Sequence, residues 1–80
     1  MKDTRHFRDM LGERNIPFDL VDAAIASPDA TEEKPDGTRH YLKKCESRDG
    51  RWLRVVVNVH TQPNQRITAF FDRRLRRKEK

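Results

Sequence analysis

The sequence contains a single cysteine, Cys45, and no long apolar segment. One cysteine cannot form a disulfide within the chain, which is typical of proteins in a reducing cytoplasm. No apolar run approaches the roughly 20 residues that a membrane-spanning helix needs. The first ten residues, MKDTRHFRDM, include no apolar stretch of the kind found in secretory signals. We therefore expect a cytoplasmic protein that does not bind a membrane.

Glycine and histidine are also scarce, which argues against two common kinds of site. The three glycines are isolated from one another, so the chain has no glycine-rich loop for a phosphate. The three histidines and the cysteine stand at unrelated spacings and form no metal-binding motif. We expect neither a metal ion nor an organic cofactor.

Hydrophobic residues make up only 34% of the 80 residues, whereas 39% are charged. A typical globular chain has roughly 25% charged residues. A chain of this length forms at most one domain, and its core must be small. Stabilisation by a partner, or by a second copy in a homodimer, would suit such a composition.

The net charge of +5 is concentrated at the C-terminus. Residues 72–80, DRRLRRKEK, hold six basic and two acidic residues, which leaves 12 basic and 11 acidic residues in positions 1–71. We therefore divide the chain into one domain, residues 1–71, and a basic tail, residues 72–80. The tail could bind phosphates or an acidic partner, or it could be a solvated terminus. Its candidate nucleic-acid-binding residues are Arg73, Arg74, Arg76, Arg77 and Lys78.

Two helices are predicted in the first third of the sequence. Phe7, Met10 and Leu11 recur at helical spacing after Asp3 and Thr4, either of which could be the N-cap, and this predicts a helix over residues 4–15. A second helix is predicted over residues 17–27, because proline suits the first helical turn and the proline at position 28 disfavours the helical conformation before it.

The rest of the domain predicts strands. Residues 30–34 read as a short, polar edge strand, and residues 38–47, 49–60 and 66–71 read as longer strands. Turn signals with proline, asparagine or an Asp-Gly pair separate these segments. The order predicts an α+β fold, in which two N-terminal helices pack on one face of a three- to four-stranded antiparallel sheet.

Alternation divides the strand DGRWLRVVVNVH, residues 49–60, into two rows. One row is apolar and should face the helices: Leu53, Val55, Val57 and Val59. The other should lie on the uncovered face, together with Arg66, Thr68 and Phe70 of the next strand: Trp52, Arg54, Val56, Asn58 and His60. Arg39, Tyr41 and Lys43 could join this face, although the phase of their strand is ambiguous. Rings mixed with cations are typical of RNA-binding surfaces, and a merely solvated face is the alternative.

Several short motifs together resemble a small prokaryotic family known only as a domain of unknown function. They are His6, Met10 and Arg14 at four-residue spacing, then N-I-P, S-P-D, R-H-Y, D-G-R-W-L-R-V-V-V and R-I-T-A-F-F. That family is similar to the BrnT and RelE toxins, which are ribonucleases that cut messenger RNA and are neutralised by an antitoxin. The resemblance covers roughly residues 4–71. It implies a RelE/BrnT-like fold, an RNA substrate that could be bound on the ribosome, and a cognate antitoxin.

The resemblance also implies roles for particular residues. RelE-type cleavage needs cations that stabilise a charged transition state, and often a group that manages the proton of the 2′-hydroxyl. The candidate cations are Arg54, Arg66 and Lys43, and the candidate proton-transfer groups are His60, Tyr41 and His6. Trp52 and Arg39 are candidates for RNA binding. BrnT-like toxins usually carry an arginine on the last strand, where this chain has Phe70.

Each candidate also has a structural interpretation. Arg54 could pair with Glu32, Glu33 or Glu46 across the sheet. His40, beside Tyr41, is more typical of an ordinary sheet residue than of an acid or base. Two functions therefore remain open at this point. One is a toxin-like, metal-independent endoribonuclease, and the other is a non-catalytic RNA-binding or protein-binding module on the same scaffold.

Overall fold

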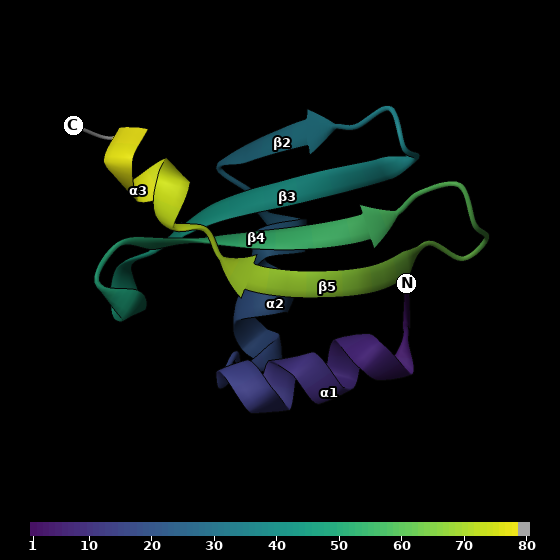
Figure 1. Cartoon of the computed structure of the whole chain (residues 1–80), viewed down its shortest axis with the longest axis horizontal. Coiled ribbons are helices and arrows are strands. Elements are labelled where there is room, and N and C mark those ends of the chain that lie inside the picture. The colour runs from purple at the N-terminus through teal and green to yellow at the C-terminus, as the bar shows by residue number, and fades with distance from the viewer. Residues whose placement is uncertain (79–80) are drawn as a thin grey trace.

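The computed structural model describes the backbone of residues 1–78 and the side chains of residues 1–75. Figure 1 shows a sheet with two N-terminal helices and a short C-terminal helix. The α+β class expected from the sequence is confirmed. The elements in chain order are β1 (Lys2–Asp3), α1 (Arg5–Arg14), α2 (Phe18–Ala26), β2 (Ala30–Glu33), β3 (Thr38–Cys45), a 3₁₀ turn (Glu46–Arg48), β4 (Arg51–Asn58), β5 (Gln65–Phe71) and α3 (Arg73–Lys78).

The sheet has five strands in the order β1-β5-β4-β3-β2. Strands β2 to β5 form the expected antiparallel meander, and β2 is the short polar edge strand. The expectation of a purely antiparallel sheet of three or four strands is wrong, because β1 pairs in parallel with β5. Two residues are too few to show a periodicity, so β1 left no signal in the sequence.

Both helices begin and end within one residue of the bounds that the sequence predicted. The Thr4 hydroxyl caps α1 by accepting a hydrogen bond from the Phe7 backbone N–H at 3.0 Å. The helix ends at Asn15, which adopts the left-handed conformation with φ of 54°. Pro17 precedes α2, and the chain leaves that helix at Ser27, one residue before a proline.

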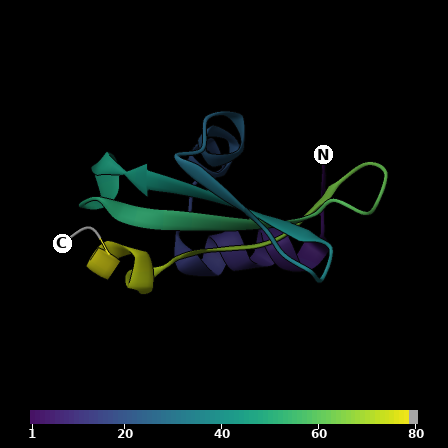
Figure 2. The ribbon, with the colours of Figure 1, turned by 90° about the horizontal axis from the view of Figure 1, so that it is seen from above.

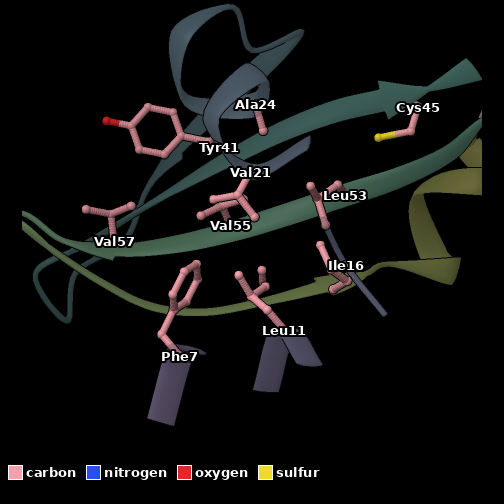
Figure 3. Close-up of a cluster of buried hydrophobic side chains, with 11 residues drawn as sticks. Phe7, Leu11, Ile16, Val21, Ala24, Tyr41, Cys45, Leu53, Val55 and Val57 are labelled. Atoms are coloured by element: carbon pink, nitrogen blue, oxygen red, sulfur yellow. The ribbon is translucent and has the colours of Figure 1, made fainter. Parts of the chain in front are cut away.

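Helices α1 and α2 pack against the apolar row of β4, as expected. Leu53, Val55 and Val57 are fully buried there, and Val59 is partly buried at the edge of the same cluster. Figure 3 shows side chains of α1 below this row and side chains of α2 above it in the view, and both sets pack on the same face of the sheet. The helical contribution comes from Phe7, Leu11, Val21 and Ala24. The core therefore lies on one face of the sheet, and the other face is left for polar residues.

A bulge between β4 and β5 moves Arg66 away from its expected face. The register passes from Val56 opposite Thr68 to Val57 opposite Arg66, so β5 carries Ile67 as an additional residue. Strict alternation had placed Arg66 on the uncovered face. The bulge instead places it opposite Val57, on the face that the helices cover.

Most of the basic C-terminal segment, whose conformation the sequence left open, forms a helix. Residues Arg73–Lys78 make up α3, which contacts β4. Seen from above in Figure 2, α3 lies on the opposite side of the sheet from α2. The side chains of Arg76, Arg77 and Lys78 lie outside the described residues. Within the described part of the chain, no helix is long and apolar enough to cross a membrane.

Candidate functional site

The face of the sheet opposite α2 carries a polar hollow of about 330 Å³. Strands β2 to β5 contribute residues to it, and α3 closes one end. We call it the Arg54 hollow and define it by its lining residues: Glu32, Lys34, His40, Arg54, Phe70, Asp72, Arg74 and Leu75. Register explains why they meet, since Glu32 pairs with His40, and Leu42 and Phe70 both flank Arg54.

Arg54 lies at the floor of the hollow and is only 7% exposed. Its Nε donates to Asp72 Oδ2 at 2.9 Å, and its Nη1 donates to Glu32 Oε1 at 2.9 Å. The same Nη1 is 2.8 Å from Nδ1 of His40. A guanidinium keeps its protons at any ordinary pH and can only donate. Nδ1 of His40 must therefore be the acceptor, and in the neutral ring the hydrogen is on Nε2.

The environment holds His40 in its neutral form. Burial lowers the pKa of the imidazole, and the positive charges of Arg54 and Lys34 lower it further. The nearby carboxylates of Glu32 and Asp36 act in the opposite direction but do not prevail. His40 therefore presents a neutral Nε2–H donor at physiological pH.

The two carboxylates of the hollow are both ionised but are held differently. Hydrogen bonds from Arg54 and then Lys34 lower the pKa of Glu32 to about 2. Burial alone would raise the pKa of Asp72, but hydrogen bonds from Arg74 and Arg54 outweigh it and leave that pKa lowered. Asp72 also accepts from the backbone N–H of Arg74 at 3.0 Å, and so caps the first turn of α3.

The rim of the hollow is cationic and partly aromatic. Lys34 Nζ is 3.1 Å from Glu32 Oε1, and Arg74 Nε is 3.3 Å from Asp72 Oδ1. The Arg74 side chain is 79% exposed, so most of its guanidinium faces solvent. Phe70 is half-buried and forms part of the wall. Cations and an aromatic ring at a hollow of this size suit a phosphate with an attached base.

The hollow supplies hydrogen-bond donors more readily than proton acceptors. Arg54, Lys34, Arg74 and the Nε2–H of His40 can all donate to an anionic oxygen. As an acceptor His40 is already engaged, because Arg54 occupies its Nδ1. With a pKa of about 2, Glu32 is a weak base. The geometry therefore favours anion binding and charge stabilisation over proton abstraction.

Of the cations expected at a shared site, only Arg54 lies in the hollow. Arg66 is on the helix-covered face, where it bonds Asp3 of β1 and donates to Asp22 of α2 at 2.8 Å. Lys43 also lies on that face and donates to the Ser27 carbonyl at 2.9 Å. Arg66, which was expected on the uncovered face beside Arg54, is therefore not there, and Lys43, whose face the sequence left open, lies with Arg66 on the covered face.

The phase of β3 explains two further corrections. Tyr41 lies opposite Val55 and belongs to the buried core, and Arg39 lies opposite Val57 and pairs with Glu33. Both residues therefore lie on the face away from Arg54. The alternate residues of the strand share the face of the hollow instead, and this brings His40 to Arg54.

The other ring residues do not line the hollow. His60 lies beyond the end of β4, where its ring packs so closely on Gly37 that a Cβ there would lie 2.6 Å from Cδ2. Trp52 shares the face of Arg54, but its buried indole Nε1 has no hydrogen-bond partner among the described residues. His6 is exposed on α1. Of the basic tail, Arg74 lines the hollow and Arg73 is exposed beside it.

The sequence missed several residues of the hollow as functional candidates: Glu32, Lys34, His40, Asp72 and, as part of a binding wall, Phe70. Glu32 was considered only as a structural partner of Arg54, and that pairing is present. A useful signal was Asp72, the lone acid between a strand and an arginine-rich segment. A residue of this type at such a junction is a good N-cap, which would have predicted α3.

These features define an α+β domain whose open sheet face carries a buried arginine in a donor-rich polar hollow. The chain belongs to the DUF4258 family, a domain of unknown function, whose model matches residues 4–71. The family resemblance expected from the sequence is thereby confirmed at the level of an uncharacterised domain. No curated protein and no solved structure shows significant similarity to the chain.

Stability should fall in two stages on acidification. The folded chain lowers the pKa of His40, so this residue contributes stability above its ordinary pKa of 6.5, and that contribution is lost as the pH falls toward the folded value. Glu32 contributes stability above its ordinary pKa of 4.5 and loses it as the pH falls toward about 2. Thermal unfolding followed from neutral pH to about pH 3 should show both stages. In His40→Asn, whose amide oxygen can replace Nδ1 as acceptor, the first stage should disappear and the second should remain.

Proposed function

We propose that this chain binds RNA on the open face of its sheet, with one backbone phosphate held in the Arg54 hollow. The observation that carries the proposal is the neutral His40 fixed at 2.8 Å from the buried Arg54, inside a rim formed by Lys34 and Arg74. Backbone phosphate contacts supply nearly all of the sequence-independent affinity of proteins for nucleic acids and a large share of specific binding. Phe70 could stack an unpaired base beside that phosphate.

The proposal includes a relationship to the BrnT and RelE toxins and a cytoplasmic location. It places the antitoxin, where one exists, over the Arg54 hollow, because a partner that blocks the phosphate site would block RNA. A homodimer is part of the same proposal only if it leaves this face open. The short edge strand β2 and the helix α3 border the hollow, so a partner could contact both at once.

Metal-independent cleavage of messenger RNA is the second candidate function. Donors aimed at a phosphate can stabilise the extra charge that develops when the 2′-hydroxyl attacks it, and this is often the largest catalytic contribution. Arg54, Arg74 and His40 are the residues of the hollow that support this candidate. The scarcity of a free base supports the non-catalytic function instead, so the two make different predictions.

Arg74→Ala and His40→Asn test the binding site directly. Arg74 is largely exposed, so its removal should leave the fold intact while weakening binding to a labelled single-stranded RNA several-fold. The dependence of affinity on salt should also become shallower by roughly one unit of log slope. His40→Asn keeps an acceptor for Arg54 but removes the Nε2–H donor, and should weaken binding without a change in salt slope.

Arg5→Ala is the matched control, since Arg5 is exposed on α1 and its substitution removes the same charge as Arg74→Ala. It should leave affinity and slope unchanged. Equal effects of Arg5→Ala and Arg74→Ala would contradict the site. Cleavage of the RNA in the presence of a chelator by the wild type but not by Arg74→Ala would support the ribonuclease. Tight RNA binding without cleavage, together with unimpaired growth of bacteria that express the soluble chain, would support the non-catalytic RNA-binding function.

A further inference from the structure

One carboxylate oxygen already occupies the place where an anionic ligand would bind best. Oε1 of Glu32 is 2.9 Å from Arg54 Nη1 and 3.1 Å from Lys34 Nζ, so a single oxygen bridges both cations. Charge-assisted contacts between such donors and a phosphate oxygen have about the same length, roughly 2.7–2.9 Å. A phosphate that used Arg54 and Lys34 would therefore meet Glu32 in its position.

The carboxylates of Asp72 and Glu32 differ in how easily they can turn away from Arg54. The Asp72 side chain is 3% exposed, and it is fixed by Arg54, by the Arg74 side chain and by its role as the cap of α3. The Glu32 side chain is 34% exposed and belongs to a four-residue edge strand. If Glu32 turns toward solvent, Arg54 keeps its pair with Asp72, so no buried charge is left alone.

We propose that Glu32 is an internal competitor for the phosphate site, an autoinhibitory contact that an RNA phosphate must displace. This inference rests on the proposed function, since it specifies how the Arg54 hollow is kept closed to anions. The site can bind phosphate only while Glu32 is turned away, so its apparent affinity equals the intrinsic affinity multiplied by the fraction of molecules in which Glu32 is absent from the site. Glu32 therefore weakens the binding of every anion, and a ligand with several phosphates offsets this through its additional contacts with the cationic rim.

Glu32→Gln tests the competition, and the chain supplies a matched control on the same strand. Glu33 is the next residue, but its side chain is 63% exposed and pairs with Arg39 on the opposite face of the sheet. Glu32→Gln and Glu33→Gln change the net charge equally. Titration with inorganic phosphate, followed through the NMR signals of the His40 ring and the Arg54 side chain, reports binding in the hollow itself.

We expect Glu32→Gln to bind inorganic phosphate and single-stranded RNA at least about tenfold more tightly than the wild type, since it removes a like charge from the site. Glu33→Gln should change both affinities less than about twofold, because its charge lies on the other face. Glu32→Asp provides a second variant that keeps the charge but shortens the side chain by one methylene. It should weaken the contact with Arg54 and give an intermediate increase in affinity, whether or not Glu32→Gln folds fully.

The outcomes separate the inference from the proposed function. Equal tightening by Glu32→Gln and Glu33→Gln would show that only net charge matters and would overturn the competitor role. Weaker phosphate binding by Glu32→Gln or Glu32→Asp would overturn it as well, because Glu32 would then help to form the site. Phosphate binding could tighten in Glu32→Gln while neither this variant nor the wild type binds RNA. The competitor role would then be supported, and the proposed RNA-binding function would be refuted.

Discussion

Replacement of Arg54 by alanine is expected to lower the free energy of unfolding by about 3–5 kcal/mol. The loss does not come from the pair itself, whose formation also cost desolvation. It comes from the carboxylates left behind, since Asp72 is 3% exposed and would keep only Arg74, whose side chain is 79% exposed, while Glu32 would keep only Lys34. A domain of this size has roughly 4–12 kcal/mol of stability in total, so the variant should be close to unfolding.

Chemical denaturation of four proteins measures this effect. Arg54→Ala, Asp72→Asn and the double variant complete a cycle with the wild type. The double variant should be less destabilised than the sum of the single changes, because the buried carboxylate that Arg54 faces is then no longer charged. Arg39→Ala is the control, since it breaks a solvent-exposed pair with Glu33 and should change stability little. Additive effects in the cycle would contradict a coupled buried pair.

This expectation decides how functional variants are interpreted. The sequence made Arg54 a candidate cation on the uncovered sheet face, with pairing to a nearby glutamate as the alternative. Its burial means that loss of RNA binding in Arg54→Ala would not distinguish a missing contact from a missing fold. Arg74 and His40 are better targets, because Arg74 is exposed and His40 can be replaced by an acceptor of similar position.

Local patterns predicted the elements because each depends on residues that are close in sequence. Thr4 caps α1, Pro17 precedes α2, and the alternation of Leu53 and Val55 fixes the buried face of β4. None of these requires knowledge of a distant partner. This is why the helices, the meander and the central core row could be read from the sequence.

The candidate site depended on three features that local patterns do not contain. In β3, the alternate rows of Tyr41 and His40 each mix apolar with polar residues, so periodicity could not choose the buried one. In β5, the additional residue Ile67 reverses the face of Arg66. The third feature is the bond between Arg54 and Asp72, which joins residues 18 positions apart in the sequence through the docking of α3.

Together these features replace the open polar surface expected from the sequence with a network of ion pairs. The sequence suggested cations on the uncovered face, with a glutamate pair for Arg54 as the alternative, and in the structure Arg54 and Arg66 each contact two carboxylates. The two arginines nevertheless have different roles. Arg66 joins β1, α1 and α2 on the covered face, and Arg54 lies in a hollow that solvent can enter. Arg66 borders a hollow of its own, of about 310 Å³, with Asp22, but the Arg54 hollow adds the side-chain cations of Lys34 and Arg74, which favour a ligand in place of a carboxylate.

Phe7→Ala is expected to destabilise the protein by about 3–5 kcal/mol, an effect as large as that of Arg54→Ala. Phe7 is fully buried, and its ring packs against the core from α1. The ring also supports the Arg66 guanidinium, whose carbon lies 5.4 Å from the ring centroid. Because Arg66 bonds Asp3 of β1 and Asp22 of α2, loss of the ring should loosen all three N-terminal elements.

Two matched variants separate the contributions within that loss. Phe18→Ala makes the same chemical change at a position that is 44% exposed, and should cost less than about 1 kcal/mol. Phe7→Leu keeps most of the apolar volume but removes the aromatic face, and should cost about 1–2 kcal/mol. Hydrogen exchange would then show faster opening of β1 in Phe7→Leu, while the amides of β3 and β4 stay protected. If Phe7→Leu is as stable as the wild type, Arg66 is held by its carboxylates alone, and the ring serves only to fill the core.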